Sequence, residues 1–292
     1  MQSACLTGLG ITVPIVLGPM AGSVGPDLVA AVSNAGGLGL FPLWHLEPSE
    51  TKANVAATRA LTSKPFGLNF NNNYPMGGHL DAAIDEGIGI ASFFWGLDAT
   101  NIRRAKDAGM TVLQTIGTAA EAREAIDCGA DMVVAQGWEA GGHVWSTVAT
   151  LALIPAVVDA VAPVPVIAAG GIADGRGLAA VLALGASAGW IGTRFLLATE
   201  ATIDAARRSR IAAASEADTV MGKDPQPRWH DSAIRWIGRP EERWAYEYGP
   251  DGRQLAGQGV GLVNREQPAA TIVADIWREA RATISTLRQH HE

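Results

Sequence analysis

The chain has few cysteines, few charges and no long uninterrupted apolar run. Its 292 residues include only two cysteines, Cys5 and Cys128, which excludes a disulfide framework and a cysteine-based metal site. Charged residues make up 17% and apolar residues 48%, a balance typical of a compact core and not of a disordered segment. The formal charge of −7 at pH 7 argues against a nucleic-acid-binding surface.

A membrane span and a leader peptide are not expected. The most apolar stretch, about 147–172, carries Asp159 and three prolines, which is incompatible with a helix across the bilayer. The N-terminal region has no basic segment, and Gly8, Gly10 and Pro14 interrupt its apolar residues. We therefore expect a cytoplasmic protein that binds neither membranes nor nucleic acid.

Several motifs for metals, nucleotides and hydrolysis are also missing. The sequence contains no His-Glu-x-x-His, no paired Cys-x-x-Cys, no P-loop and no Gly-x-Gly-x-x-Gly that opens a helix after a strand. Residues 185–189 match Gly-x-Ser-x-Gly, but a nucleophile elbow must follow a strand and open a helix. Here the segment closes a helical pattern and opens a strand, so we interpret the match as chance.

The chain does contain one repeating unit, from residue 15 to about 195: a short apolar run, a turn and an Ala-rich helical pattern. Strands that alternate with helices of about 10–15 residues predict parallel βαβ units. Eight such strands favour an α/β fold of the (β/α)8 TIM-barrel type, with an open doubly wound sheet as the alternative. The predicted strands are 15–18, 38–41, 66–70, 89–92, 110–115, 131–135, 164–168 and 188–192.

The composition changes after the last predicted strand. Residues 222–262 hold four prolines and three tryptophans without periodicity, which predicts a long ordered excursion and a candidate lid over the barrel mouth. An amphipathic closing helix follows from Gln267 onward. We therefore divide the chain into a barrel (1–215), a Trp- and Pro-rich excursion (216–264) and a C-terminal helix that packs back on the barrel (265–292).

The last two predicted barrel strands end in small residues. One leads into Ala169, Gly170 and Gly171, and the other into Gly192 and Thr193. Glycines leave backbone N–H groups bare and let a ligand approach the main chain. The N-terminus of the helix that begins near 174 would add a positive dipole end. Since these loops form the phosphate site of many (β/α)8 barrels, they predict binding of a phosphorylated small molecule.

A histidine follows the sixth predicted strand. His143 comes directly after Gly141 and Gly142, and this places it at the C-terminal rim of the barrel, where catalytic residues lie. A neutral imidazole suits a general base at pH 7, although a histidine that caps a loop carbonyl is the plainer alternative. His45 follows the second strand and is a candidate for the pocket wall.

Amide side chains end or follow three other strands. Asn69, Gln114 and Gln136 donate and accept hydrogen bonds without charge, which suits the edge of a neutral heterocycle. Each could instead satisfy loop backbone. The segment 18–21, with Gly18, Pro19, Met20 and Ala21, is small enough to lie against a flat ring.

At these residues the chain resembles the nitronate monooxygenase family, formerly the 2-nitropropane dioxygenases, which are FMN-dependent barrels. The similarity covers roughly residues 12–200, and flavin enoyl-ACP reductases and flavin quinone reductases share much of it. The blocks that carry it are 14–20 (PIVLGPM), 34–39 (NAGGLG), 66–69 (FGLN), 139–143 (EAGGH), 169–175 (AGGIADG) and 192–195 (GTRF).

The resemblance implies FMN as the cofactor, His143 as the catalytic base, and oxidation of alkyl nitronates or nitroalkanes by dioxygen to a carbonyl compound and nitrite. Some family members continue after the histidine with Pro-Gly-Glu, whereas this chain has Val144, Trp145 and Ser146. The substrate wall should therefore differ, and His45 and Trp145 are candidates for it. The FMN-binding residues implied are Gly18, Pro19, Met20, Ala21, Asn69, Gln114, Gln136, Gly141, Gly142, Ala169, Gly170, Gly171, Gly192 and Thr193.

Two other functions remain open at this point. One is an NAD(P)H-dependent flavin reductase that acts on enoyl thioesters or quinones, for which the sequence shows no nicotinamide site. The other is a non-catalytic flavin-binding protein. A homodimer is compatible with the sequence, and the expected partners are a small-molecule substrate and dioxygen.

Overall fold

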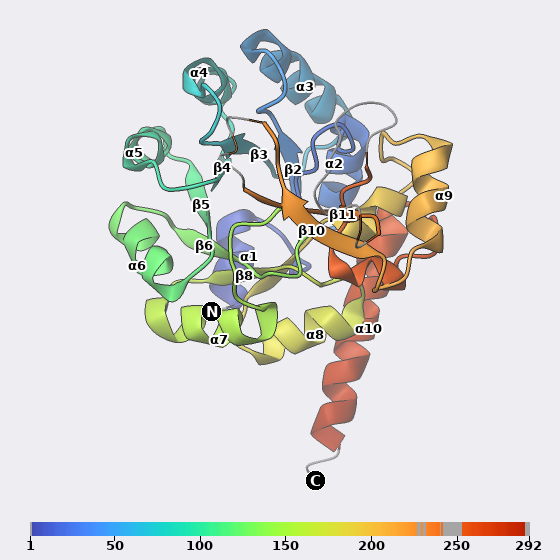
Figure 1. Cartoon of the computed structure of the whole chain (residues 1–292). Coiled ribbons are helices and arrows are strands. Elements are labelled where there is room, and N and C mark those ends of the chain that lie inside the picture. Colours follow the sequence, from blue (N-terminus) through green and yellow to red (C-terminus); the bar gives the residue numbers. More distant parts are fainter. Residues whose placement is uncertain (1, 227–228, 230–231, 240, 242–252, 290–292) are drawn as a thin grey trace.

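The computed structural model describes residues 2–226, 229, 232–239, 241 and 253–289 (Figure 1). Eight parallel strands form one sheet in the order β1-β9-β8-β6-β5-β4-β3-β2. Because helices cover the outer face of this sheet, nearly every strand residue is buried. The strands are β1 (Ile15–Leu17), β2 (Gly39–Pro42), β3 (Phe66–Asn71), β4 (Ile90–Phe94), β5 (Thr111–Ile116), β6 (Met132–Gln136), β8 (Val166–Ala169) and β9 (Ala188–Ile191).

A bridge brings the two edge strands of this sheet together. Val16 of β1 pairs with Leu38, the residue before β2. The Leu17 amide donates to the Leu38 carbonyl at 2.8 Å, and the Leu38 amide donates to the Ile15 carbonyl at 2.9 Å. The sheet is therefore a nearly closed barrel. This confirms the predicted TIM-like α/β fold and excludes the open doubly wound sheet.

Helices surround the barrel and connect its strands (Figure 1). Positive φ angles of +80° at Gly109 and +105° at Gly129 end the helices after 107 and 127, as left-handed C-terminal caps do. The segment 185–189 joins α8 to β9, so it is not a nucleophile elbow. The helices are α2 (Pro26–Asn34), α3 (Pro48–Leu61), α4 (Gly77–Asp85), α5 (Ala99–Asp107), α6 (Ala119–Asp127), α7 (Thr150–Val161), α8 (Gly175–Ala183) and α9 (Ala205–Ala213).

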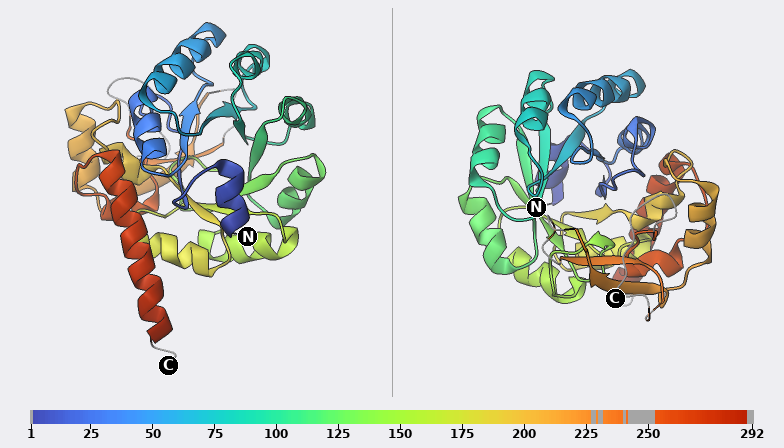
Figure 2. Two further views of the ribbon diagram at one scale, coloured as in Figure 1. Left: turned by 180° about the vertical axis from the view of Figure 1, so that it is seen from behind. Right: turned by 45° about the horizontal axis from the view of Figure 1, so that its top comes forward.

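The N-terminal helix α1 (Gln2–Leu9) closes the end of the barrel opposite to the one that faces the reader in Figure 1 (Figure 2, left). Cys5 and Leu9 pack there against the barrel interior, together with Val16 and Met132. Burial raises the pKa of the Cys5 thiol to about 12, so this cysteine behaves as a small apolar side chain. The open end of the barrel is therefore the one at the carboxyl ends of the strands.

A three-stranded antiparallel sheet lies across that open end (Figure 1). It consists of β10 (Thr219–Lys223), β11 (Ala233–Ile237) and the short β7 (Gly142–His143). The 222–262 excursion thus contributes most of a hairpin that pairs with the loop after β6, with His143 opposite Ile234. Residues 227–228, 230–231, 240 and 242–252 of the predicted excursion lie outside the described residues.

The chain ends in the long helix α10 (Ala269–Gln289). Its first turns pack against the barrel through buried Ile272, Val273, Ile276 and Ala280, whereas its last turns project beyond the barrel (Figure 2, left). A short 3₁₀ helix, η4 (Gln258–Leu262), connects the excursion to α10. No helix within the described ranges is both long and apolar enough to cross a membrane.

Candidate active site

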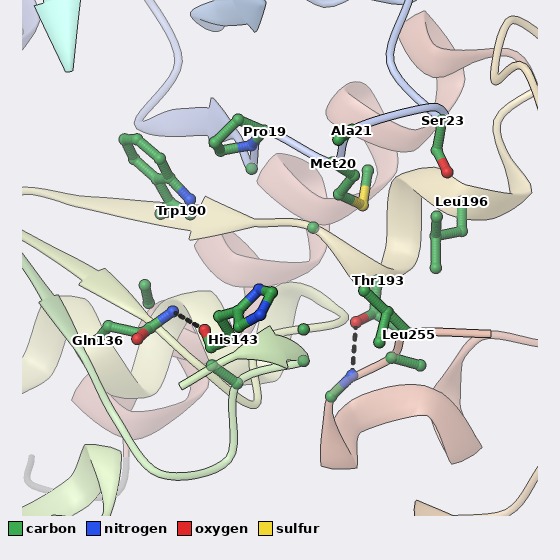
Figure 3. A pocket seen from close by; sticks show the side chains of 18 of the residues that line it. Pro19, Met20, Ala21, Ser23, Gln136, His143, Trp190, Thr193, Leu196 and Leu255 are labelled. Carbon is green, nitrogen blue, oxygen red and sulfur yellow. Dashed lines mark hydrogen bonds between the residues drawn. The ribbon is translucent and has the colours of Figure 1, made fainter. Parts of the chain in front are cut away.

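A cavity of about 520 Å³ opens at the carboxyl ends of the barrel strands, within the range of roughly 300–1,000 Å³ found for small-molecule sites. Loops after β1, β6, β8 and β9 line it (Figure 3), and residues 253–257 and Gly259 cover one side. Fifteen of the residues singled out from sequence reach it: Gly18, Pro19, Met20, Ala21, His45, Asn69, Gln136, Gly141, Gly142, His143, Ala169, Gly170, Gly171, Gly192 and Thr193.

Backbone amides form an anion cradle in this cavity, which we define as the main chain of 171–172 and 192–193. Within the described part of the chain, these four amides donate to no acceptor. Gly171 adopts φ +74°, a left-handed conformation that favours glycine. Such a concave set of unpaired N–H groups is suited to a phosphate.

Thr193 adds a hydroxyl to the cradle. Its Oγ1 accepts a hydrogen bond of 2.9 Å from the Gly257 amide (Figure 3). The hydroxyl proton therefore remains to be donated to a ligand. The same contact attaches the returning end of the excursion to the segment after β9.

The N-terminus of α8 does not contribute to the cradle, contrary to the sequence-based expectation. The Asp174 carboxylate accepts from the amides of Arg176 and Gly177 at 3.0 and 3.1 Å, and Glu279 of α10 accepts from the Gly175 amide at 2.7 Å. These carboxylates neutralise the helix end from within the protein. The bare loop amides that precede α8 thus carry the anion site.

Asn69 presents an unsatisfied acceptor beside the cavity. Its Nδ2 donates to Ser92 Oγ at 3.0 Å, while the fully buried Oδ1 has no partner among the described residues. A buried carbonyl oxygen without a donor is costly unless a ligand supplies one. This side chain therefore fits the N–H group of a bound heterocycle.

Gln136 has a second role besides lining the cavity. Its Nε2 donates to the His143 carbonyl at 3.2 Å (Figure 3), and its Oε1 accepts from the Trp145 amide at 2.8 Å. Both bonds hold the loop after β6. The amide thus fixes the backbone of His143 at the cavity wall.

Gln114 is not among the residues that line the cavity, so its predicted place at the cofactor has no support from its position. Its Nε2 donates to the carbonyls of Gly96 and Thr115 at 3.0 and 2.9 Å. Side chains alternate between the two faces of a strand, and the neighbouring Thr115 is the residue of β5 that lines the cavity. A single amide residue at the end of a predicted strand does not show which face of the strand its side chain is on.

Trp145 is also absent from the cavity wall. Its indole Nε1 donates to Glu121 Oε2 at 2.8 Å, and the ring lines a separate outer hollow together with Trp95 and Trp138. A polar indole edge with a carboxylate partner explains this outward position. The assignment of Trp145 to the substrate pocket is therefore not supported by its position.

His143 lies on the cavity wall with an acidic partner that the sequence did not indicate. Its Nε2 lies 2.7 Å from Oδ2 of Asp224, which is completely buried. Asp224 directly follows β10, 81 positions away in the chain. The sequence does not predict this contact, because the two segments come together only through the antiparallel pairing of β7 with β11.

Two tryptophans contact the His143 imidazole and fix the orientation of its ring. Trp229 stacks on His143 with ring centroids 3.3 Å apart at 13°, and Trp95 contacts it edge-on at 5.7 Å. Trp95 has a φ of +71°, a strained conformation for a bulky residue that the surroundings must enforce. Burial lowers the pKa of His143 from 6.5, while the Asp224 carboxylate opposes this shift.

The cavity mouth carries positive charge. Arg207 of α9 and Arg253 line it, and the Arg207 guanidinium also pairs with the Asp204 carboxylate at 3.6 Å. The Arg253 guanidinium lies 5.5 Å from the centre of the Trp236 ring, a cation–π arrangement. Among the described residues no cluster of His, Cys, Asp and Glu could hold a metal ion.

A family model and a full-length relative place the chain in the same family. Residues 3–77 and 72–230 match the family described as nitronate monooxygenase. A "Nitronate monooxygenase" from Paraburkholderia phytofirmans is 33% identical across 99% of this chain and 98% of its own length.

Other relatives carry a different name. Proteins from Rhodococcus jostii and Mycobacterium tuberculosis are 40% and 42% identical over 76% and 73% of this chain. Both are named "(3aS,4S,5R,7aS)-5-hydroxy-7a-methyl-1-oxo-octahydro-1H-indene-4-carboxyl-CoA dehydrogenase". The similarity spans only 63% and 61% of their lengths.

Solved structures agree on the fold. FabK from Thermotoga maritima superposes with a TM-score of 0.90 at 32% identity and covers 98% of both chains. A nitroalkane oxidase from Streptomyces ansochromogenes gives a TM-score of 0.85 at 28% identity, with 97% of this chain and 99% of the other covered.

Proposed function

The chain belongs to the nitronate monooxygenase family of FMN-dependent oxidoreductases, and from this premise we propose that it oxidises nitroalkanes and alkyl nitronates with dioxygen, with His143 as the base. The products are a carbonyl compound and nitrite. The observation that carries the proposal is the geometry of His143: its Nε2 is engaged by buried Asp224 on the wall of a cavity that also contains the anion cradle.

The cavity fits FMN at both ends of the cofactor. The anion cradle and the Thr193 hydroxyl offer donors for the terminal phosphate. The buried Oδ1 of Asn69 offers an acceptor for the N–H edge of the ring, and Met20 and Pro19 lie against the same space (Figure 3). We therefore assign the cofactor to these residues and to Gly170 and Gly192.

His143 moves the proton in this proposal. With Nε2 engaged by Asp224, Nδ1 is the ring nitrogen with a lone pair for the α-carbon proton of a nitroalkane. The anion cradle and Asn69 would hold FMN, which would supply the redox chemistry between the resulting anion and dioxygen. The indole rings of Trp229 and Trp95 cover part of the imidazole and exclude water from that side.

The pH dependence of turnover follows from the His143 pKa. Only the neutral imidazole accepts a proton, and burial lowers its pKa below 6.5. We expect kcat/KM for a neutral nitroalkane to stay constant as the pH falls to 6.5 and then to decrease about tenfold per pH unit below the lowered pKa. Initial rates of oxygen uptake between pH 5 and 9 measure this, and a decline that begins above 6.5 would contradict the assignment.

Two measurements test the proposed activity directly. The absorbance spectrum of the purified protein is expected to show bound flavin, and oxygen uptake with alkyl nitronates and with propionate 3-nitronate is expected to accompany nitrite release. Anaerobic mixing with NADH is the counter-test. Rapid flavin bleaching without nitronate turnover would favour a reductase instead.

The positive cavity mouth favours a second candidate, an oxidoreductase that acts on a coenzyme A thioester. Arg207 and Arg253 line the opening through which the phosphates of such a substrate would extend. The relatives named as CoA-ester dehydrogenases support the same substrate class.

Arginine variants separate the two candidates. If the thioester is the substrate, Arg207→Ala is expected to raise its KM about tenfold, equivalent to roughly 1.4 kcal/mol of binding, and to leave the KM of ethylnitronate unchanged. Arg210→Ala, an exposed residue of the same helix that does not line the cavity, is the matched control. Equal KM values for the thioester in both variants would rule out the phosphate contact.

A further inference from the structure

The His143–Asp224 pair has a geometry that sets the protonation pattern of the imidazole. Nε2 of His143 and Oδ2 of Asp224 are 2.7 Å apart, and a carboxylate in this position accepts a hydrogen bond. Nε2 therefore carries the proton. Nδ1 has no hydrogen-bond partner among the described residues, so its lone pair remains available.

Asp224 is itself held in one orientation. Its second oxygen, Oδ1, accepts from the Gln226 amide at 2.9 Å, and its own amide donates to the Ser232 carbonyl at 2.9 Å. The carboxylate is fully buried, so water does not compete for Oδ2. The imidazole cannot turn away either, because Trp229 stacks on its face at 3.3 Å.

The backbone of His143 is fixed by the same segment. His143 pairs with Ile234 of β11, and the Val144 amide donates to the Ala233 carbonyl at 2.9 Å. The small antiparallel sheet thus positions the base, and the residue after β10 supplies its acidic partner. A role as a mere cover over the barrel would need no buried carboxylate at this point.

We propose that Asp224 is a positioning residue that holds His143 in the Nε2–H tautomer, so that Nδ1 receives the proton of the substrate carbon. The inference rests on the proposed function for its catalytic part, whereas the tautomer itself is independent of any substrate. It assigns a role in the reaction to the hairpin of β10 and β11, which lies outside the barrel.

The variant Asp224→Asn makes the proposal testable because it inverts the hydrogen bond. If the asparagine Oδ1 keeps the bond from the Gln226 amide, its Nδ2 takes the place of Oδ2 and donates to Nε2. The proton must then sit on Nδ1, where the base needs its lone pair. In the Ser-His-Asp triad of serine proteases, the same Asp→Asn substitution inverts the histidine tautomer and lowers kcat by about 10⁴-fold.

The first measurement is a long-range ¹H–¹⁵N spectrum of the ¹⁵N-histidine-labelled, flavin-loaded protein, with the His143 signals assigned by their loss in His143→Gln. We expect the Nε2–H tautomer in the wild type, the Nδ1–H tautomer in Asp224→Asn and a mixture in Asp224→Ala. Asp218→Asn is the matched control, because this exposed residue bonds to Ser215 in the same segment and does not contact His143. Retention of the Nε2–H tautomer in Asp224→Asn would overturn the proposal.

The second measurement separates positioning from general damage. Asp224→Asn is expected to lower kcat for neutral nitroethane by about 10²–10⁴-fold and to lower kcat for preformed ethylnitronate less than about tenfold, since the anion needs no base. Equal losses with both substrates would contradict a positioning role. If the wild type oxidises neither substrate, the proposed function fails, and the spectrum still decides the tautomer.

Discussion

Replacing His143 by alanine is expected to slow the turnover of a neutral nitroalkane by about 10²–10⁴-fold, the usual contribution of a general base. The imidazole lies on the cavity wall and is bonded to Asp224, and no other described side chain combines these features. FMN content should be unchanged, because the anion cradle belongs to the loops after β8 and β9. Steady-state oxygen uptake with nitroethane, together with the flavin absorbance per protein, measures both effects.

Two comparisons make the His143 result specific. His143→Gln keeps an N–H group that can donate to Asp224 but has no basic nitrogen, so it should lose as much activity as the alanine variant. Preformed ethylnitronate, which needs no deprotonation, should remain a substrate of both variants. Wild-type rates with nitroethane in either variant would show that another group is the base.

Replacing Gly192 by valine is expected to yield a colourless protein, with FMN affinity lowered by at least about 100-fold, or roughly 2.7 kcal/mol. Gly192 has a φ of −104°, and a Cβ at this position would meet only Met20, whose Sδ lies 3.5 Å away, an ordinary contact. The Cβ of the new side chain therefore fits without a positive φ and without a close contact. The isopropyl group would occupy cavity space beside the anion cradle.

Gly89→Val is the matched control for this substitution. Gly89 is exposed and does not require a positive φ, and a Cβ added there would meet no atom within 4 Å. It precedes β4, at the end of the barrel away from the cavity. This variant should bind FMN like the wild type, as measured by titration of the apoprotein with FMN and by flavin fluorescence. Full flavin occupancy in Gly192→Val would refute the placement of the cofactor.

The barrel could be predicted from sequence because its signals are local. Each of the eight predicted strands overlaps a strand of the structure, since short apolar runs between Ala-rich helical patterns report burial on both faces. The glycine after each of several helices marks its end. The small sheet could not be predicted in this way, because its β7 strand has only two residues and its hairpin lies in a segment without periodicity.

The candidate site was predictable only in part. Glycine-rich strand ends and a histidine at the rim are recognisable in the chain, and these residues line the cavity. Two of the predicted residues do not line the cavity: side chains alternate along β5, so that Thr115 lines it instead of Gln114, and Trp145 donates to Glu121. The capped N-terminus of α8 was missed because Glu279 comes from the C-terminal helix.

By itself, the sequence determined the barrel, the anion cradle and the histidine that faces the cavity, since each of these depends on neighbours within one βα unit. Only the tertiary structure decided which groups surround that histidine. Asp224 and Trp229 reach it from a hairpin that comes 81 or more residues later in the chain, and such long-range pairing is set by packing and hydrogen bonding between segments. The secondary-structure propensities of the separate segments do not encode this pairing. The acidic partner of His143 could therefore be identified only in the folded chain.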